Sequence, residues 1–252
     1  MKTLSVYAYV VLNMISTLFS KRKYNSMKSK GNKEEAEQFL HKVVKQWARG
    51  ILDKAGVTVN VTGLENLPDD ACCFVSNHQG DFDIVTILAT IDKPMGFIAK
   101  KEMEKLPIIS WWMKQMQCVF MDRSNVREAL KAINEGSENM KNGQSMVIFP
   151  EGTRSKSSTM GEFKKGSLKM ATKAKVPIVP ITLDGTYKIY EGNNGKIKSG
   201  EVKMVVGNPI YLYELSREDQ KNISEIVKSE IVKTYNKSVK KKTLLYTFII
   251  YY

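Results

Sequence analysis

The middle of the chain alternates short apolar runs with segments of helical spacing, and this alternation limits the folds open to it. We expect strands at residues 57–63, 72–76, 96–99, 119–121, 145–150, 178–183 and 201–206, and helices at 83–89, 108–115, 126–142 and 165–174. Strands that alternate with helices favour an α/β fold, with a mostly parallel central sheet flanked by helices.

Three residues are expected to mark the ends of helices. Ser124 is placed to cap the helix at 126–142, and Gly143 follows its last residue. Ser216 begins an S-x-x-D capping pattern that ends at Asp219 and is expected to open a C-terminal helix.

Positive charge is concentrated at the two ends. The chain of 252 residues has 39 basic and 26 acidic residues; positions 1–50 hold 10 basic and 3 acidic ones, and positions 217–252 hold 8 and 4. We therefore divide the chain into N-terminal helices at 1–50, a body at 51–215, and a C-terminal helix with a basic and apolar tail at 216–252. Basic ends indicate a polyanionic partner, either nucleic acid or an acidic membrane.

The N-terminal segment Leu4–Phe19 has no charged residue and is followed by Lys21-Arg22-Lys23. Sixteen residues fall short of the roughly 20 that cross a bilayer. A cleaved signal peptide, a soluble core helix and a membrane anchor are the alternatives; the basic triplet favours an anchor on the cytoplasmic face, whether it spans or lies on the membrane. Residues 34–49 form an amphipathic pattern, typical of a core-facing helix or of a second membrane-surface helix. The tail at 243–252 is too short to span.

Several kinds of site are disfavoured by what the chain contains. Three cysteines (Cys72, Cys73, Cys118) and two histidines give no disulfide framework and no zinc motif, so we expect no metal. Nucleotide-binding GxxxxGK[ST] and GxGxxG motifs and the GxSxG of serine hydrolases do not occur. A cysteine nucleophile is disfavoured because no thiol falls inside the two polar loops described next.

The first polar loop, SNHQGDFD at 76–83, directly follows an expected strand. A histidine that acts as a base needs a partner on one ring nitrogen, which leaves the other nitrogen free to take a proton. Asp83, at the start of the next helix, can reach back across the turn to His78. The alternative is that this aspartate only caps the helix.

The second polar loop, FPEGTRS at 149–155, also follows a buried strand. Its backbone N–H groups, its hydroxyls and the guanidinium of Arg154 make a suitable anion receptor, near Lys164 and Lys165. The alternative is an ordinary solvated basic loop. In mostly parallel sheets, loops at the carboxyl ends of strands carry chemistry, so both loops are candidate site elements.

Taken in order, these motifs resemble the glycerolipid acyltransferases, in particular the 1-acyl-sn-glycerol-3-phosphate acyltransferases. NHQGDFD resembles the NHxxxxD box of that family, and the other matching segments are GFIAKKE (96–102), CVFMDR (118–123), FPEGTRS with the following F-K-x-G (163–166), and VPIVPI (176–181). Gln117 stands where the family often has a glycine before the second box.

The resemblance implies a reaction: acyl transfer from a thioester, acyl-CoA or acyl-carrier protein, to the sn-2 hydroxyl of lysophosphatidic acid, without a covalent acyl-enzyme. In it, His78 is the general base and Asp83 orients it. The expected phosphate-binding residues are Arg154, then Arg123, Lys101 and Lys100, with Glu151, Gly152 and Thr153 contacting or orienting the substrate.

The same resemblance implies membrane lipids as partners, with no nucleic acid and no cofactor beyond the acyl donor, and leaves the oligomeric state open. Two rivals remain: a related acyltransferase for another lysophospholipid or glycerol 3-phosphate, and a non-enzymatic basic protein that binds membranes.

Overall fold

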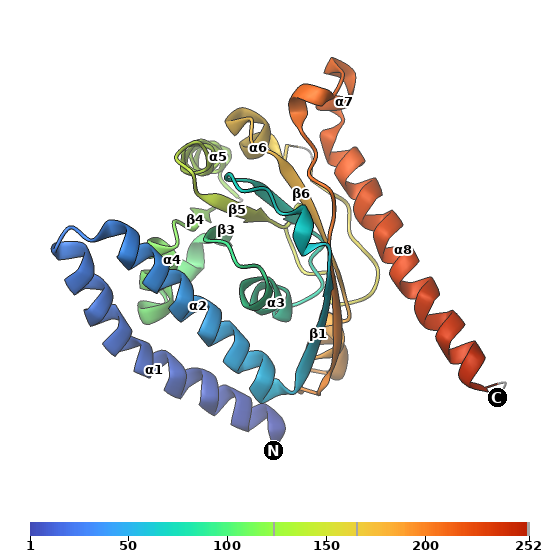
Figure 1. Ribbon diagram of the computed structural model, residues 1–252, viewed down its shortest axis with the longest axis horizontal. Helices are drawn as coiled ribbons and strands as arrows, with labels where there is room; N and C mark the ends of the chain where they lie inside the picture. Colours follow the sequence, from blue (N-terminus) through green and yellow to red (C-terminus); the bar gives the residue numbers. More distant parts are fainter. Residues whose placement is uncertain (123, 165, 251–252) are drawn as a thin grey trace.

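The computed structural model describes the backbone of residues 1–122, 124–164 and 166–250, with side chains as far as residue 237. Within these residues, seven strands form one sheet in the order β1-β7-β6-β2-β5-β3-β4 (Figure 1). The strands are β1 (Val57–Thr62), β2 (Cys73–Ser76), β3 (Met95–Lys100), β4 (Val119–Met121), β5 (Ser145–Ile148), β6 (Ile178–Asp184) and β7 (Gly200–Val206). Only the β6–β7 pair is antiparallel among them, so the predicted mostly parallel sheet is confirmed.

The reversal of β7 determines what lies at each edge of the sheet. The carboxyl ends of β2, β3, β4, β5 and β6 lie together, at the end of the strands that we call one edge of the sheet. Because β7 runs against β6 and β1 runs parallel to β7, the amino ends of β7 and β1 also lie at this edge. The connection at residues 185–199 and the end of the helix before β1 are therefore brought to the same edge as the two polar loops.

Helices cover both faces of the sheet (Figure 1). On one face lie α2 (Lys33–Ala55) and α3 (Phe82–Thr90), and on the other α5 (Val126–Lys141), α6 (Lys169–Ala174) and α8 (Ile223–Ile250). Strand β2 shows how alternate side chains fill the two cores. Phe74 packs in the cluster that contains Ile51 of α2, whereas Cys73 and Val75 pack in the cluster that contains Ile231 of α8.

Two helix starts differ from the sequence-based expectation. Asn125, not Ser124, caps α5, because its side chain accepts hydrogen bonds from the N–H groups of Arg127 and Glu128. Ser124 instead donates to the Asp122 carboxylate. Helix α6 begins at Lys169 rather than at residue 165, after a turn in which Gly166 has φ of +79°.

The other helix ends are as expected, except that the C-terminal helix is in two parts. Gly143, with φ of +90°, follows the last turn of α5, and the Ser216 side chain accepts from the Asp219 N–H. This cap opens only the short helix α7 (Arg217–Lys221), and α8 begins at Ile223. The side chains of the tail at 240–252 lie outside the described residues.

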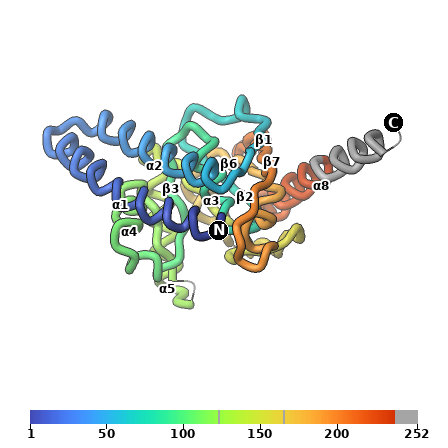
Figure 2. Tube along the Cα trace, turned by 90° about the horizontal axis from the view of Figure 1, so that it is seen from below, coloured from blue at the N-terminus to red at the C-terminus, as the bar shows by residue number. Residues whose placement is uncertain are grey.

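At the N-terminus, α1 (Lys2–Ser29) and α2 form a hairpin that extends from the body (Figure 2). The last turns of α2 are buried in the main core through Ala48, Ile51, Leu52 and Ala55. Near the hairpin's turn, α4 (Pro107–Gln115) packs on α1, where the Trp112 indole N–H donates to Thr17 Oγ1 over 3.0 Å. The hairpin is thus fastened to the body along much of its length.

One side of α1 remains apolar and uncovered. Its exposed side chains, which we call the outer face of α1, are Leu4, Tyr7, Val11, Leu12, Ile15, Leu18 and Phe19. Among the described residues, α1 alone is long and apolar enough to cross a membrane by length and composition. Only 11% of its most apolar stretch of 18 residues is buried.

Candidate active site

His78 and Asp83 form a buried pair at the carboxyl end of β2. The Nδ1 atom of His78 is 2.7 Å from Oδ2 of Asp83, and the side chains are 15% and 0% exposed. The residue after β2, Asn77, exchanges two hydrogen bonds with the Leu183 backbone of β6, which fixes the start of the loop. The contact predicted from the sequence is therefore present, and the Nε2 side of the ring is left to face a substrate.

Asp83 is oriented by the first turn of α3 as well as by the histidine. Its Oδ2 also accepts the Gly80 N–H at 2.8 Å, whereas its Oδ1 is buried with no hydrogen-bond partner in the described structure. A buried carboxylate with one free oxygen is costly unless a cation or a strong donor lies nearby. The His78 ring and the Gly80 N–H lie within hydrogen-bond distance of this carboxylate and hold it in place.

The two polar loops lie side by side. The N–H groups of Ser155 and Lys156 donate to the carbonyls of His78 and Gln79, at 2.8 and 3.1 Å. The ring of Phe149 stacks on His78. The sequence-based expectation that two strand-end loops meet is confirmed, since both strands run in the same direction and are hydrogen-bonded neighbours.

Glu151 supports the histidine loop from the second loop. Its Oε1 accepts the His78 backbone N–H at 2.7 Å and its Oε2 accepts the Gly161 N–H at 2.7 Å. Burial raises the pKa of the Glu151 carboxyl, and these two N–H donors act in the opposite direction. The contacts of Glu151 are therefore with the backbone, so it holds the His78 loop rather than the Arg154 guanidinium.

Arg154 is held by two other carboxylates. Its NH1 atom is 2.5 Å from Asp81 Oδ1 and 3.4 Å from Glu191 Oε1. Asp81 belongs to the His78 loop, so the guanidinium lies beside that loop as expected. Glu191 was not anticipated from the sequence, because it comes from the connection between β6 and β7, far along the chain.

The other expected site residues differ in how closely they approach. Gly152 has φ of +72° and the Lys164 side chain lies over it, whereas Thr153 is exposed. Lys100 ends β3, two strands from β2 or about 10 Å across the sheet. Lys101 follows it and its Nζ is 3.9 Å from Glu128 Oε2. Arg123 lies outside the described residues.

Gln117 and the cysteines also have clear places in the structure. Gln117 has φ of +57°, the left-handed conformation that favours the glycine often found there in the resembling family. All three thiols are buried, and burial raises the pKa of Cys72 to about 11 and that of Cys118 to about 12. These thiols are therefore poor nucleophiles, which agrees with the sequence-based exclusion.

Comparison with known proteins gives the family. The acyltransferase family model matches residues 58–184, which is half of the chain. This chain belongs to the acyltransferase family. The matched range contains both polar loops, the strands β2 to β6 and all of β1 except Val57.

Individual relatives match a longer part of this acyltransferase than the family model does. A probable 1-acyl-sn-glycerol-3-phosphate acyltransferase of Mycoplasma pneumoniae is 30% identical over 89% of this chain and 87% of its own. The chloroplastic 1-acyl-sn-glycerol-3-phosphate acyltransferase BAT2 of Brassica napus is 40% identical over 69% of this chain. The chain spans about half the length of BAT2 and of its Arabidopsis thaliana counterpart.

A solved structure resembles the whole acyltransferase fold. The crystal structure of the 1-acyl-sn-glycerophosphate acyltransferase PlsC from Thermotoga maritima superposes with a TM-score of 0.83 at 28% identity, and covers 94% of both chains. The superposed length includes much of the N-terminal hairpin, because 94% of the chain leaves few residues out.

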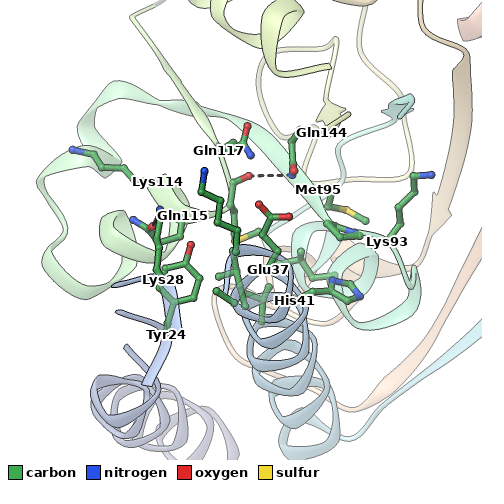
Figure 3. A pocket seen from close by; sticks show the side chains of 17 residues that line it. Tyr24, Lys28, Glu37, His41, Lys93, Met95, Lys114, Gln115, Gln117 and Gln144 are labelled. Carbon is green, nitrogen blue, oxygen red and sulfur yellow. Dashed lines mark hydrogen bonds between the residues drawn. The ribbon is translucent and has the colours of Figure 1, made fainter. Parts of the chain in front are cut away.

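A cavity of about 320 Å³ lies elsewhere in the acyltransferase, between the α1–α2 hairpin and α4. Figure 3 shows Tyr24, Lys28, His41 and Lys114 around it. Its lining also includes Met95 and Gln144, at or just before the amino ends of β3 and β5. The cavity is therefore at the opposite edge of the sheet from His78.

Proposed function

We propose that this protein transfers a fatty acyl group from a thioester to the sn-2 hydroxyl of 1-acylglycerol 3-phosphate, giving phosphatidic acid. The observation that carries the proposal is the meeting of a His78–Asp83 pair with the Arg154 guanidinium across two hydrogen-bonded loops. The names of the relatives, which denote 1-acyl-sn-glycerol-3-phosphate acyltransferases, support the same acceptor.

The reaction needs a base because an alcohol is a weak nucleophile at neutral pH. His78, oriented through Nδ1 by Asp83, takes the hydroxyl proton at Nε2 as the oxygen attacks the thioester carbonyl. The tetrahedral intermediate then breaks its C–S bond and releases a thiolate, which the imidazolium can protonate. The substrate's hydroxyl stands where a serine stands in a Ser-His-Asp triad, so no acyl-enzyme forms.

Arg154 binds the acceptor's phosphate in this proposal, since a guanidinium pairs well with a phosphate through two hydrogen bonds. Lys100 and Lys101 at the end of β3 add positive charge at the same edge, and Arg123 stays a further phosphate-binding residue of the proposal on the resemblance alone. The co-substrate is acyl-CoA or acyl-carrier protein, and no cofactor is required.

The outer face of α1 suits contact with a membrane on the cytoplasmic side. Its apolar side chains precede Lys21, Arg22 and Lys23, and each basic residue near an anionic surface contributes about 1 kcal/mol. Thr17 and Tyr24 tie α1 to the body through Trp112 and Trp111, which favours a helix that lies in the interface over one that leaves the body to span.

The decisive experiment is transfer of labelled acyl groups from acyl-CoA and from acyl-carrier protein to a panel of acceptors. We expect product with lysophosphatidic acid, acylated at sn-2. Efficient turnover of glycerol 3-phosphate or lysophosphatidylcholine, with little on lysophosphatidic acid, would favour the related-acyltransferase rival. Vesicle binding with no thioester turnover would favour a non-enzymatic protein.

A further inference from the structure

The two carboxylates that contact Arg154 differ sharply in exposure. The Asp81 side chain is 57% exposed, whereas that of Glu191 is 4% exposed. Both contact NH1 of the guanidinium. A phosphate that arrives from solvent can replace the exposed carboxylate, but it cannot reach the place of the buried one.

Glu191 is buried in a way that costs stability. Its Oε1 accepts the Asp81 backbone N–H at 2.8 Å, while its Oε2 is buried with no hydrogen-bond partner in the described structure. Burial raises the pKa of the Glu191 carboxyl, and the Asp81 N–H and Arg154 oppose this. A Cβ atom at Gly80 would overlap the Glu191 carboxylate, so glycine is needed for this approach.

The segment that carries Glu191 is held from two directions, by Gln79 of the His78 loop, whose Oε1 accepts the Gly185 N–H at 3.0 Å, and by the start of α1. Glu191 begins a short 3-10 helix, Glu191–Asn193, in the connection between β6 and β7. The start of α1 holds this connection: Tyr7 Oη donates to Tyr190 Oη at 2.8 Å, and the Ile197 N–H donates to Thr3 Oγ1 at 2.9 Å. Glu191 therefore has a fixed position against which the Arg154 guanidinium can be oriented.

We propose that Glu191 is a positioning residue of the acceptor site, which holds the Arg154 guanidinium and the Asp81 backbone from the protein side. The Asp81 carboxylate occupies the solvent side of the same guanidinium and leaves it when the acceptor's phosphate binds. This inference rests on the proposed function, because that function assigns the phosphate. It gives the two carboxylates opposite effects on acceptor affinity.

The test compares Glu191→Gln with Asp81→Asn, using lysophosphatidic acid in detergent micelles at a fixed donor concentration. We expect Glu191→Gln to raise the acceptor KM about tenfold, since a misplaced guanidinium no longer meets the phosphate. Asp81→Asn should lower it about threefold, because an exposed competing ion pair is lost. The donor KM and the melting temperature should change little in both. Glu162→Gln, at an exposed carboxylate paired with Lys228, is the matched control and should change none of these values.

Changes of opposite sign in the acceptor KM of the two variants would separate a positioning role of Glu191 from a simple effect of its negative charge. If both substitutions lower the acceptor KM, Glu191 is only a second negative charge and the proposal is wrong. It is also wrong if Glu191→Gln leaves the acceptor KM unchanged, or raises the donor and acceptor KM together while lowering the melting temperature.

Equilibrium binding of lysophosphatidic acid in the same micelles keeps the two proposals apart. Wild type that binds this lipid without transferring acyl groups would contradict the proposed function, while weaker binding by Glu191→Gln and tighter binding by Asp81→Asn would still support the role of Glu191. Turnover by wild type with equal binding by all variants would support the function and overturn the inference. Neither binding nor turnover would overturn both.

Discussion

The rings of His78 and Phe149 stack face to face, with centroids 4.0 Å apart and planes inclined by 17°. One ring comes from each polar loop. Asp83 contacts the imidazole at its Nδ1 atom, whereas Phe149 covers one face of the ring. Asp83 fixes the ring through Nδ1, and Phe149 fixes its plane. The imidazole is thus held by one hydrogen bond and one aromatic contact.

Replacing His78 should remove catalysis and leave the fold. We expect His78→Ala to lower kcat about 10²- to 10⁴-fold, because that is the usual contribution of general-base catalysis. The melting temperature should fall by only a few degrees, since the residue is at a loop. The chain offers a matched control in His41, whose Nε2 is 2.8 Å from Asp92 Oδ1 and which lines the cavity at the opposite edge of the sheet. His41→Ala should keep its turnover; substantial activity in His78→Ala would refute the base assignment.

Asp83→Asn should separate orientation from stability. His78 Nδ1 and the Gly80 N–H both contact the same atom, Asp83 Oδ2. An amide nitrogen in that place donates to Nδ1 and puts the ring proton on Nε2, where it blocks proton uptake, whereas an amide oxygen keeps both contacts but lacks the negative charge that balances an imidazolium. We expect kcat to fall about 10²-fold or more with little change in KM. The free energy of unfolding should fall by no more than about 1–3 kcal/mol, the cost of leaving one buried polar group without its partner.

Asp92→Asn is the control for this change, since Asp92 also contacts a histidine but lies at the surface. The hydrogen bonds from Lys45 and His41 lower the pKa of Asp92 to about 2, so this carboxylate is charged at neutral pH. The Asp92→Asn substitution should leave kcat unaltered. A kcat for Asp83→Asn within a few-fold of wild type would mean that Asp83 serves only as part of the α3 turn.

Polar substitutions on the outer face of α1 should weaken membrane binding without loss of chemistry. Leu12, Ile15 and Phe19 are 66%, 50% and 72% exposed. Changing all three to Gln should reduce binding to anionic vesicles at least about tenfold, because each buried apolar side chain contributes about 1.5–3 kcal/mol. Turnover of substrate in detergent micelles should be kept.

The matched control replaces two exposed apolar residues of α5, Val126 and Leu130, with Gln. Vesicle binding should be unaffected by this pair. Equal losses in both variants, or none in the α1 variant, would contradict the assignment of this face to the membrane. Truncation of residues 1–50 is a poorer test, since it would cut α2 and expose the core that Ile51 and Leu52 help to fill.

The thiols should resist modification while the protein is folded. Burial raises the pKa of Cys72 to about 11, so at pH 8 only about one thiol in a thousand is ionised there, and Cys118 is less ionised still. We expect no labelling by a thiol-specific disulfide reagent at pH 8 and full acyl-transfer activity after exposure, with three thiols titrated once the chain is unfolded. Rapid loss of activity on labelling would reopen the case for a cysteine nucleophile.

Much of the body could be predicted from the sequence because its signals are local. Strand β4 was predicted to the residue, and most other strands to within one or two, since short apolar runs bounded by turns are distinctive. The contact of His78 with Asp83 was predictable for the same reason: five residues and one turn separate them. The meeting of that loop with Arg154 needed only the parallel arrangement of the sheet.

What the sequence did not reveal depends on non-local geometry. Glu191 follows Tyr190 in a connection rich in glycine and asparagine, and no local pattern marks it as a site residue. Its place at the site depends on the direction of β7, the strand between β1 and β6, whose orientation short-range preferences do not determine. Likewise, α1 extends ten residues past the apolar segment to Ser29, because the lysines and arginine that follow are good helix formers.

The reversed β7 also has a practical meaning for protein engineering. It gathers the start of β1, the 185–199 connection and both polar loops at one rim of the sheet, and leaves the opposite rim without any of them. At that opposite rim the turn through Gly143, just before β5, has open space around its backbone. A fluorescent reporter or affinity epitope inserted there would lie away from His78 and Arg154. The same insertion between residues 192 and 196 would displace Glu191, which contacts Arg154.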